Sequence, residues 1–245
     1  SAVVAPSGEL GGGVRRSVQP RAFRCARRCC FYRITRLSAW LGLHRLSLSA
    51  WDLDVSGEVD PVPANVALPF HLYSLNIEIT SLPSHNLLQA LFQASSTTLT
   101  SLSIDIIAEA GLPTLLKSLP LVASNIKHLT LPGRLNPPLD LSFLSTFTAL
   151  ESLTLASPKP ATDLVLPLLP PSVQRLAIVT IRSSIPKVAR AIEELLPALP
   201  AAAALRWIDF SPVPLDRFDR LKSAGLLDAC AKRSVGIWFS DGWIS

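Results

Sequence analysis

The sequence of 245 residues contains no methionine and only four cysteines. Because no initiator Met is visible, we expect the chain to be a fragment, a processed form or the product of a gene model cut upstream. Three cysteines stand close together at Cys25, Cys29 and Cys30, and Cys230 is alone near the end. Four thiols are too few for a disulfide framework, so a reducing, intracellular location is expected, either cytoplasmic or nuclear.

Long hydrophobic runs are also missing, although 49% of the residues are hydrophobic and only 17% are charged. A membrane-spanning helix needs roughly 18 or more apolar residues in succession. The nearest candidate, Leu195 to Leu205, is shorter and carries Pro197 and Pro200. The composition is that of a globular chain and not of a disordered one. We therefore expect no membrane span.

Motifs that carry catalysis are absent as well. The sequence has no Gly-x-Ser-x-Gly, no phosphate-binding loop, no His-Glu-x-x-His and no Gly-x-Gly-x-x-Gly, and its four histidines are scattered. We therefore predict that the protein is not an enzyme, with no catalytic, cofactor-binding or metal-binding residues and no cofactor.

Basic charge is concentrated at the start of the chain. Residues 1–45 hold nine arginines and one acid, a net charge of +8, whereas the rest holds 14 basic and 17 acidic residues, a net charge of −3. The total of +5 therefore describes a basic arm on a nearly neutral body, and no specific nucleic-acid binding is expected. Residues 1–20 are expected to be disordered. In the basic segment 21–42, Phe23, Ala26 and Cys30 recur at a spacing that favours a short helix.

One pattern, apolar-x-x-apolar-x-apolar, recurs through most of the sequence. Its seven clear copies begin at Leu43, Leu72, Leu99, Ile126, Leu150, Val173 and Leu205. A weaker copy runs from Val235 to Phe239, and successive clear copies start 23 to 32 residues apart. The alternation within a copy is typical of a strand with one buried face. In the copy that begins at Leu150, this predicts that Leu150, Leu153 and Leu155 are buried.

Apolar residues at helical spacing lie between the copies. From Asn86 to Ala94 they include Leu87, Leu88, Leu91 and Phe92, which predicts a helix with one apolar side. Near the end of the chain a helix through Leu221 is expected to stop at Gly225. Helices between strands supply the crossovers that parallel strands require.

Copies of this pattern at this period resemble the leucine-rich repeat family, over about residues 43–239. The resemblance implies an α/β solenoid with a curved parallel sheet on its concave side and helices or irregular segments on its convex side. About 7–8 irregular repeats would form a domain over residues 43–245. Many family members carry an Asn ladder, whereas the matching places here hold other residues, among them Thr80, Arg134 and Pro158. The uneven period is closer to the repeats of fungal F-box-associated proteins.

The resemblance also implies a function. Residues 21–35 resemble the stretch in which fungal F-box domains run into their first repeat, although no F-box itself is visible. The implied protein is a non-enzymatic interaction module, the substrate-recognition subunit of a cullin–RING ubiquitin ligase, which reaches the ligase adaptor through an upstream segment. A repeat scaffold with no ubiquitin link is the alternative. The basic arm also fits an organelle transit peptide, an anion-binding tail or a gene-model artefact.

In the leucine-rich-repeat architecture the strand residues between the apolar positions face the concave side, where a protein partner is expected. The candidate binding residues are Arg45, Asn76, His128, Thr154, Arg175, Trp207 and Asp209. Trp and Arg are frequent anchors of interfaces. Trp207 fits equally well a contact residue or a cover over the last repeat, and Trp238 is favoured as a cover.

Two local motifs resemble metal sites. Residues 52–60 match a calcium-binding EF-hand loop at six positions, but Pro63 stands where the bidentate Glu belongs. An acidic loop between repeats is the favoured interpretation, and a metal-binding protein or enzyme built on residues 52–60 is the third alternative for function. Cys25, Cys29 and Cys30 lack a second pair of zinc ligands, so ordinary thiols are favoured over zinc or lipidation.

Overall fold

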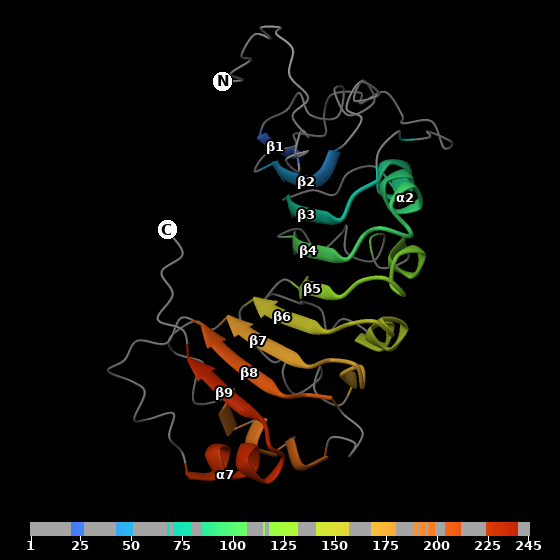
Figure 1. The fold of residues 1–245 in the computed structure, drawn as a ribbon. Coiled ribbons are helices and arrows are strands. Elements are labelled where there is room, and N and C mark those ends of the chain that lie inside the picture. The colour runs from blue at the N-terminus through green and yellow to red at the C-terminus, as the bar shows by residue number, and fades with distance from the viewer. Residues whose placement is uncertain are drawn as a thin grey trace, which may run out of the picture.

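Nine strands of the described residues form one open parallel sheet, with the strands in sequence order from β1 to β9 (Figure 1). The structure is a computed structural model that describes residues 21–26, 43–50, 68, 71–79, 85–106, 115, 118–131, 141–156, 168–179, 189–190, 192–194, 196–198, 204–211 and 224–239. The strands are β1 (Arg21–Ala26), β2 (Leu43–Ala50), β3 (Ser74–Ile79), β4 (Ser101–Ile106), β5 (His128–Leu131), β6 (Ser152–Ala156), β7 (Arg175–Val179), β8 (Trp207–Ser211) and β9 (Gly236–Phe239).

Strands β2 to β8 coincide with the seven copies of the apolar pattern, and β9 with the weaker copy. All three apolar positions are buried in every one of the seven copies: Leu43, Leu46, Leu48, Leu72, Leu75, Ile77, Leu99, Leu102, Ile104, Ile126, Leu129, Leu131, Leu150, Leu153, Leu155, Val173, Leu176, Ile178, Leu205, Ile208 and Phe210. No copy can bury its apolar face alone, so stacking the copies creates one continuous core. The predicted burial of Leu150, Leu153 and Leu155 is confirmed.

A backbone ladder leads the chain into each of the strands β4 to β8. The carbonyl of Lys127 accepts hydrogen bonds from the N–H groups of Glu151, at 2.8 Å, and Ser152, at 2.9 Å. The carbonyls of Tyr73, Thr100, Glu151 and Gln174 are used in the same way. This repeated double bond holds equivalent residues of successive copies side by side and thereby sets the register of the sheet.

Helical segments cover one side of the sheet. They are α2 (His85–Ala94), the 3-10 turns η3 (Leu119–Leu121), η4 (Leu141–Thr146) and η6 (Leu196–Ala198), and α7 (Ala224–Lys232). In Figure 1, α2 and the turns that follow it stack along the right-hand side of the strands. Leu88, Leu91 and Phe92 of α2 are fully buried, which confirms the helix predicted there. The predicted α/β class and parallel sheet are therefore observed as a solenoid-like stack.

Helices long and apolar enough to cross a membrane are not found in the described residues.

Two local predictions are wrong. Arg21–Ala26 is a strand and not part of a helix, because its backbone pairs in parallel with β2, with Phe23 opposite Leu46 and Cys25 opposite Leu48. Helical spacing in so short a segment cannot compete with the backbone pairing of a parallel sheet. Gly225 was expected to end a helix, but it is the second residue of α7. The Glu193 carboxylate lies against it, since a Cβ on Gly225 would stand 1.7 Å from Oε1.

Several sequence predictions lie outside the described residues. They concern residues 1–20, the acidic loop at 52–60, and Cys29 and Cys30.

Candidate protein-binding face

The side chains that alternate with the buried apolar residues form rows across the sheet, which we call the open face. The first row is Arg45, Ser74, Ser101, His128, Ser152, Arg175, Trp207 and Gly236. The second row is Ser47, Asn76, Ser103, Thr130, Thr154, Ala177, Asp209 and Trp238. A third row, at the end of the strands, includes Glu78, Asp105, Val179 and Ser211. Neighbouring members of a row are about 4.8 Å apart, the spacing of strands in a sheet.

The middle of the open face carries small hydroxylated side chains. Ser103, Thr130 and Thr154 follow one another in the second row and are half-buried. Asn76 is also half-buried, and its Nδ2 donates a hydrogen bond of 3.2 Å to Ser47 Oγ on the neighbouring strand. The side chains in this part of the face are polar and short, so a polypeptide backbone can approach the sheet closely.

An ion pair stands beside the middle of the open face, where β5 and β6 begin. Lys127 Nζ lies 2.8 Å from Glu151 Oε1, and both side chains are exposed enough to be in water. The hydrogen bond and positive charge of Lys127, with a smaller effect of nearby His128, hold the pKa of the Glu151 carboxyl below its ordinary value. His128 is exposed in the first row. This region therefore keeps a carboxylate ionised without leaving it unpaired.

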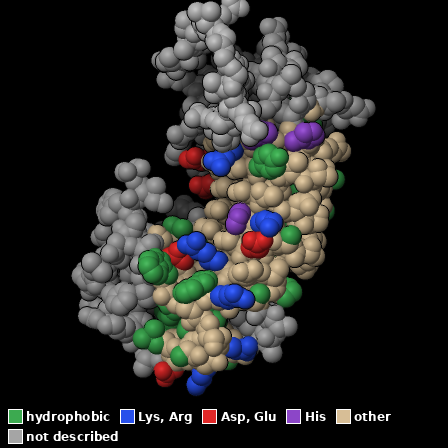
Figure 2. All heavy atoms as spheres, viewed as in Figure 1, with side chains coloured by type: hydrophobic (Ala, Val, Ile, Leu, Met, Phe, Trp, Pro, Cys, Tyr) green, Lys and Arg blue, Asp and Glu red, His purple; other side chains and the backbone are tan. Residues whose placement is uncertain are grey.

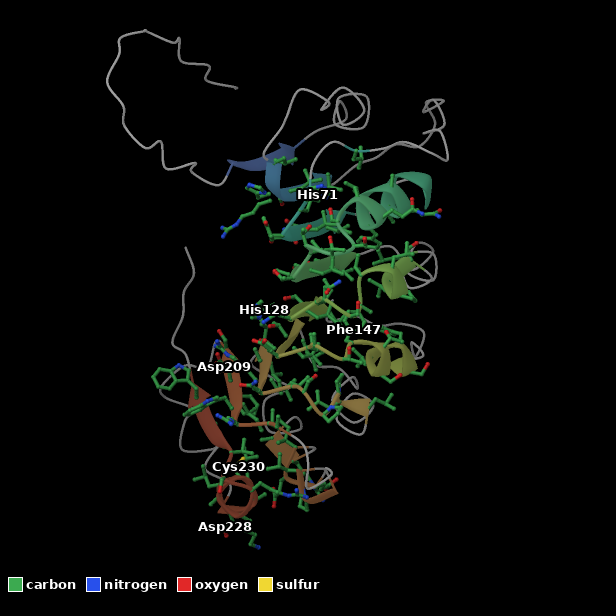
Figure 3. All side chains as sticks on the ribbon, turned by 45° about the vertical axis from the view of Figure 1, so that its right-hand side comes forward. His71, His128, Phe147, Asp209, Asp228 and Cys230 are labelled. Carbon is green, nitrogen blue, oxygen red and sulfur yellow. The ribbon has the colours of Figure 1, made fainter. Side chains whose placement is uncertain are left out.

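A second ion pair joins the first and second rows over β7 and β8. Arg175 Nη2 lies 2.5 Å from Asp209 Oδ2, although the two residues are 34 positions apart in the sequence. The side chain of Arg175 is 56% exposed and that of Asp209 only 10%. The other carboxylate oxygen, Asp209 Oδ1, is buried and has no hydrogen-bond partner. Figure 3 shows Asp209 among the C-terminal strands of the sheet.

Two tryptophans flank this carboxylate. Trp207 is 53% exposed and Trp238 is 61% exposed. Trp238 is the direct neighbour of Asp209 in the second row, and Trp207 precedes Asp209 by two residues on β8. The Trp207 ring lies over Gly236 of β9, where an added Cβ would stand 2.3 Å from Cζ3. Figure 2 shows hydrophobic, basic and acidic side chains close together over the lower strands.

All seven residues predicted for the binding face lie in the first two rows. Arg45, His128, Arg175 and Trp207 are exposed, and Asn76 and Thr154 are half-buried. Asp209 differs, because it is 7% exposed and lies beneath its neighbours. Residue spacing alone could not show this, since burial depends on how the long side chains of the adjacent strands lie.

The third row was missed by the sequence reasoning. Glu78, Asp105 and Val179 each directly follow the last apolar residue of a copy. Extending the six-residue alignment by one position would have found them, because the alternation of a strand continues to the end of its pairing.

Metal-binding groups are not gathered in this part of the molecule. Within the described ranges, no three His, Cys, Asp or Glu side chains come together in a way that could hold an ion. Compared with models of known protein families and with curated proteins, the sequence matches none. The candidate site is thus defined by its own geometry.

Proposed function

We propose that the protein is a non-enzymatic interaction module of the leucine-rich-repeat type, which binds a protein partner on the open face of its sheet. The observation that carries this proposal is the pair Trp207 and Trp238, which are more than half exposed on adjacent strands of that face. Large exposed aromatic side chains that lie together are typical of interfaces, where they anchor the partner.

The distribution of exposed apolar side chains supports the proposal. Val179, Trp207 and Trp238 all lie on the open face over β7 to β9. The other large apolar side chains exposed in the described residues are Tyr73, Leu121, Leu168 and Leu227. Single exposed apolar residues are ordinary on protein surfaces, whereas a cluster beside small, hydroxylated side chains requires an explanation.

The repeat type rests on the regularity of the buried positions. Three apolar residues at fixed spacing are buried in each of seven copies, and each copy adds one parallel strand. This arrangement supports a leucine-rich repeat over other parallel solenoids, because the copies are 23 to 32 residues apart and include helical crossovers.

Affinity purification with matched variants tests the proposal. The double variant Trp207→Ala/Trp238→Ala is expected to lose the proteins that the unaltered chain retains. The control Leu121→Ala/Leu227→Ala removes two side chains that are each 41% exposed but belong to η3 and α7, away from the open face. Partners that stay bound to the tryptophan variant but not to the control would contradict the proposal.

A narrower proposal is that the module serves as a substrate receptor of a cullin–RING ubiquitin ligase. It rests on the likeness of residues 21–35 to the end of a fungal F-box domain. Co-purification of the ligase adaptor with the longest form of the chain found in cells is the test. If the adaptor is absent while other partners bind through the tryptophans, the protein is a repeat scaffold with no ubiquitin link.

A further inference from the structure

The charges of the open face are divided between its two edges. At the edge where the strands begin, which comprises the first row and the residue before it, the basic side chains are Arg45, Lys127, Arg175 and Arg206. Glu151 is the acid there, and it is paired with Lys127. The described second and third rows of β2 to β9 carry three acids, Glu78, Asp105 and Asp209, and no basic residue. The side of the face toward the strand ends is therefore negative.

Glu78 and Asp105 face each other on neighbouring strands. They are register partners in the third row of β3 and β4, and neither forms an ion pair with another described residue. Like charges that stand opposite one another repel, so a positive group from a partner that comes between them is favoured.

The other end of the negative side presents a different cation-binding arrangement. Asp209 is two residues from Trp207 on β8 and directly opposite Trp238 on β9, and its Oδ1 lacks a donor. Indole faces are the best aromatic partners of cations. Arg175 already occupies Oδ2 and offsets the carboxylate charge, so the indoles and the free oxygen would provide most of the attraction here.

We propose that the open face binds an extended basic segment of a partner protein. One arginine of this segment lies between Trp207 and Trp238 and donates a hydrogen bond to Asp209 Oδ1, while Arg175 keeps Oδ2. A second arginine or lysine lies at Glu78 and Asp105. Both indoles are more than half exposed, so they can change rotamer as the arginine approaches without a movement of the backbone. The inference rests on the proposed function and names the chemistry of its partner.

The sheet sets the distance between the two basic residues. Asp105 is in the third row on β4 and Asp209 in the second row on β8, so four strand steps and one row separate them, or about 20 Å. An extended chain advances about 3.3 Å per residue, so the two basic residues should be about six positions apart. The path between them crosses Thr130 and Thr154, whose small polar side chains allow hydrogen bonds to a peptide backbone.

Calorimetric titration of the full chain with synthetic peptides tests the spacing and the charge. The probe is a Ser/Gly peptide with two arginines six positions apart and blocked ends. Its comparators carry citrulline or glutamate in place of both arginines, or the two arginines only two positions apart. The probe is expected to bind about 10-fold more tightly than the citrulline peptide and to weaken as salt is added.

Matched variants locate the contact. Trp238→Ala and the pair Glu78→Gln/Asp105→Asn should each weaken binding by about 5- to 10-fold, whereas Asp228→Asn, which removes an exposed carboxylate from α7, should leave it unchanged. Circular dichroism checks the fold of each variant. If Trp238→Ala does not fold, the pair Glu78→Gln/Asp105→Asn in the third row decides the outcome.

Three results overturn the inference: equal binding of the citrulline and arginine peptides, equal binding at both spacings, or an equal loss in Asp228→Asn. If any of these occurs while natural partners still require Trp207 and Trp238, the basic-segment inference fails and the proposed function stands. If natural partners bind the Trp207→Ala/Trp238→Ala variant as well as the unaltered chain, the proposed function fails as well.

Discussion

The indole of Trp207 lies over Gly236 on the next strand, where an added Cβ would stand 2.3 Å from Cζ3 and 2.4 Å from Cε3. Glycine within a strand often marks a place where another group approaches closely. Here the absence of a side chain at position 236 lets the ring of Trp207, an exposed candidate binding residue, approach the backbone of the next strand. The contact therefore ties the stability of β9 to the position of Trp207.

Replacing Gly236 with Ala should displace this ring. Because Trp207 is half exposed and can move, we expect a loss of about 1 kcal/mol in the free energy of unfolding, at the low end for overpacking. Urea denaturation measures the loss. In a Trp207→Ala background the same substitution should cost less, since the clash is gone. An equal cost in both backgrounds would show that the ring contact is not responsible.

Removing Arg175 should destabilise the fold more than neutralising Asp209. Arg175→Ala leaves a carboxylate that is 7% exposed without its cation, at a cost of about 1–3 kcal/mol. Asp209→Asn removes the buried charge and leaves Arg175 largely in water. Urea denaturation compares the two single variants with the double variant. The loss of unfolding free energy in the double variant should be smaller than the sum of the two single losses. A larger loss for Asp209→Asn than for Arg175→Ala would contradict this account.

The central strand allows a direct comparison of the two sides of the sheet. Leu153→Ala removes a fully buried side chain and should lower the free energy of unfolding by about 2–5 kcal/mol. Thr154→Ala, the adjacent residue on the open face, should change it by about 0.5 kcal/mol or less. Urea denaturation measures both losses. Similar losses at the two positions would mean that Thr154 is packed as tightly as Leu153, and that the open face is not a surface.

The pKa of the Glu151 carboxyl reports whether Glu151 is paired with Lys127 beside the open face. In Lys127→Met the pKa of Glu151 should rise toward its ordinary value, because the hydrogen bond and charge that lower it are lost. A carboxyl with a lowered folded-state pKa stabilises the fold above its unfolded pKa, and this contribution disappears as the pH falls through the folded pKa. The free energy of unfolding of the variant should therefore depend less on pH in the acid range below about 4.5.

Carbon NMR of the side-chain carboxyl, titrated from pH 2 to 7, measures this shift. Arg206→Met removes another exposed cation that does not contribute to the Glu151 pKa, and serves as the control. A Glu151 pKa that stays low in Lys127→Met would assign the effect to other groups.

Sequence reasoning predicted the repeating strands well, because burial of three residues per copy requires only local alternation. It predicted α2 for the same reason, since Leu88, Leu91 and Phe92 lie on one side of a helix. It failed at Arg21–Ala26, where pairing with β2 outweighs helical spacing, and at Gly225, which lies against Glu193 near the start of α7. In both cases the deciding contact comes from a part of the chain distant in sequence.

The candidate site shows the same division. Aligning the copies placed Arg175, Trp207 and Asp209 in rows of the open face, and the structure keeps that placement. The alignment did not indicate that Arg175 reaches diagonally to Asp209, nor that Asp209 is buried. Long side chains have several rotamers, and their choice among them depends on neighbours that a linear pattern does not contain.

The sequence by itself determined the recurring strands, the apolar residues that they bury and the first two rows of the open face, because each follows from a period of two within a copy and from the recurrence of copies. Only the tertiary structure decided which members of those rows meet. The ring of Trp207 rests on Gly236, Arg175 pairs with Asp209, and Glu78 stands opposite Asp105 without a partner among the described residues. These relationships arise between strands, where packing and charge act across 27 or more residues of chain.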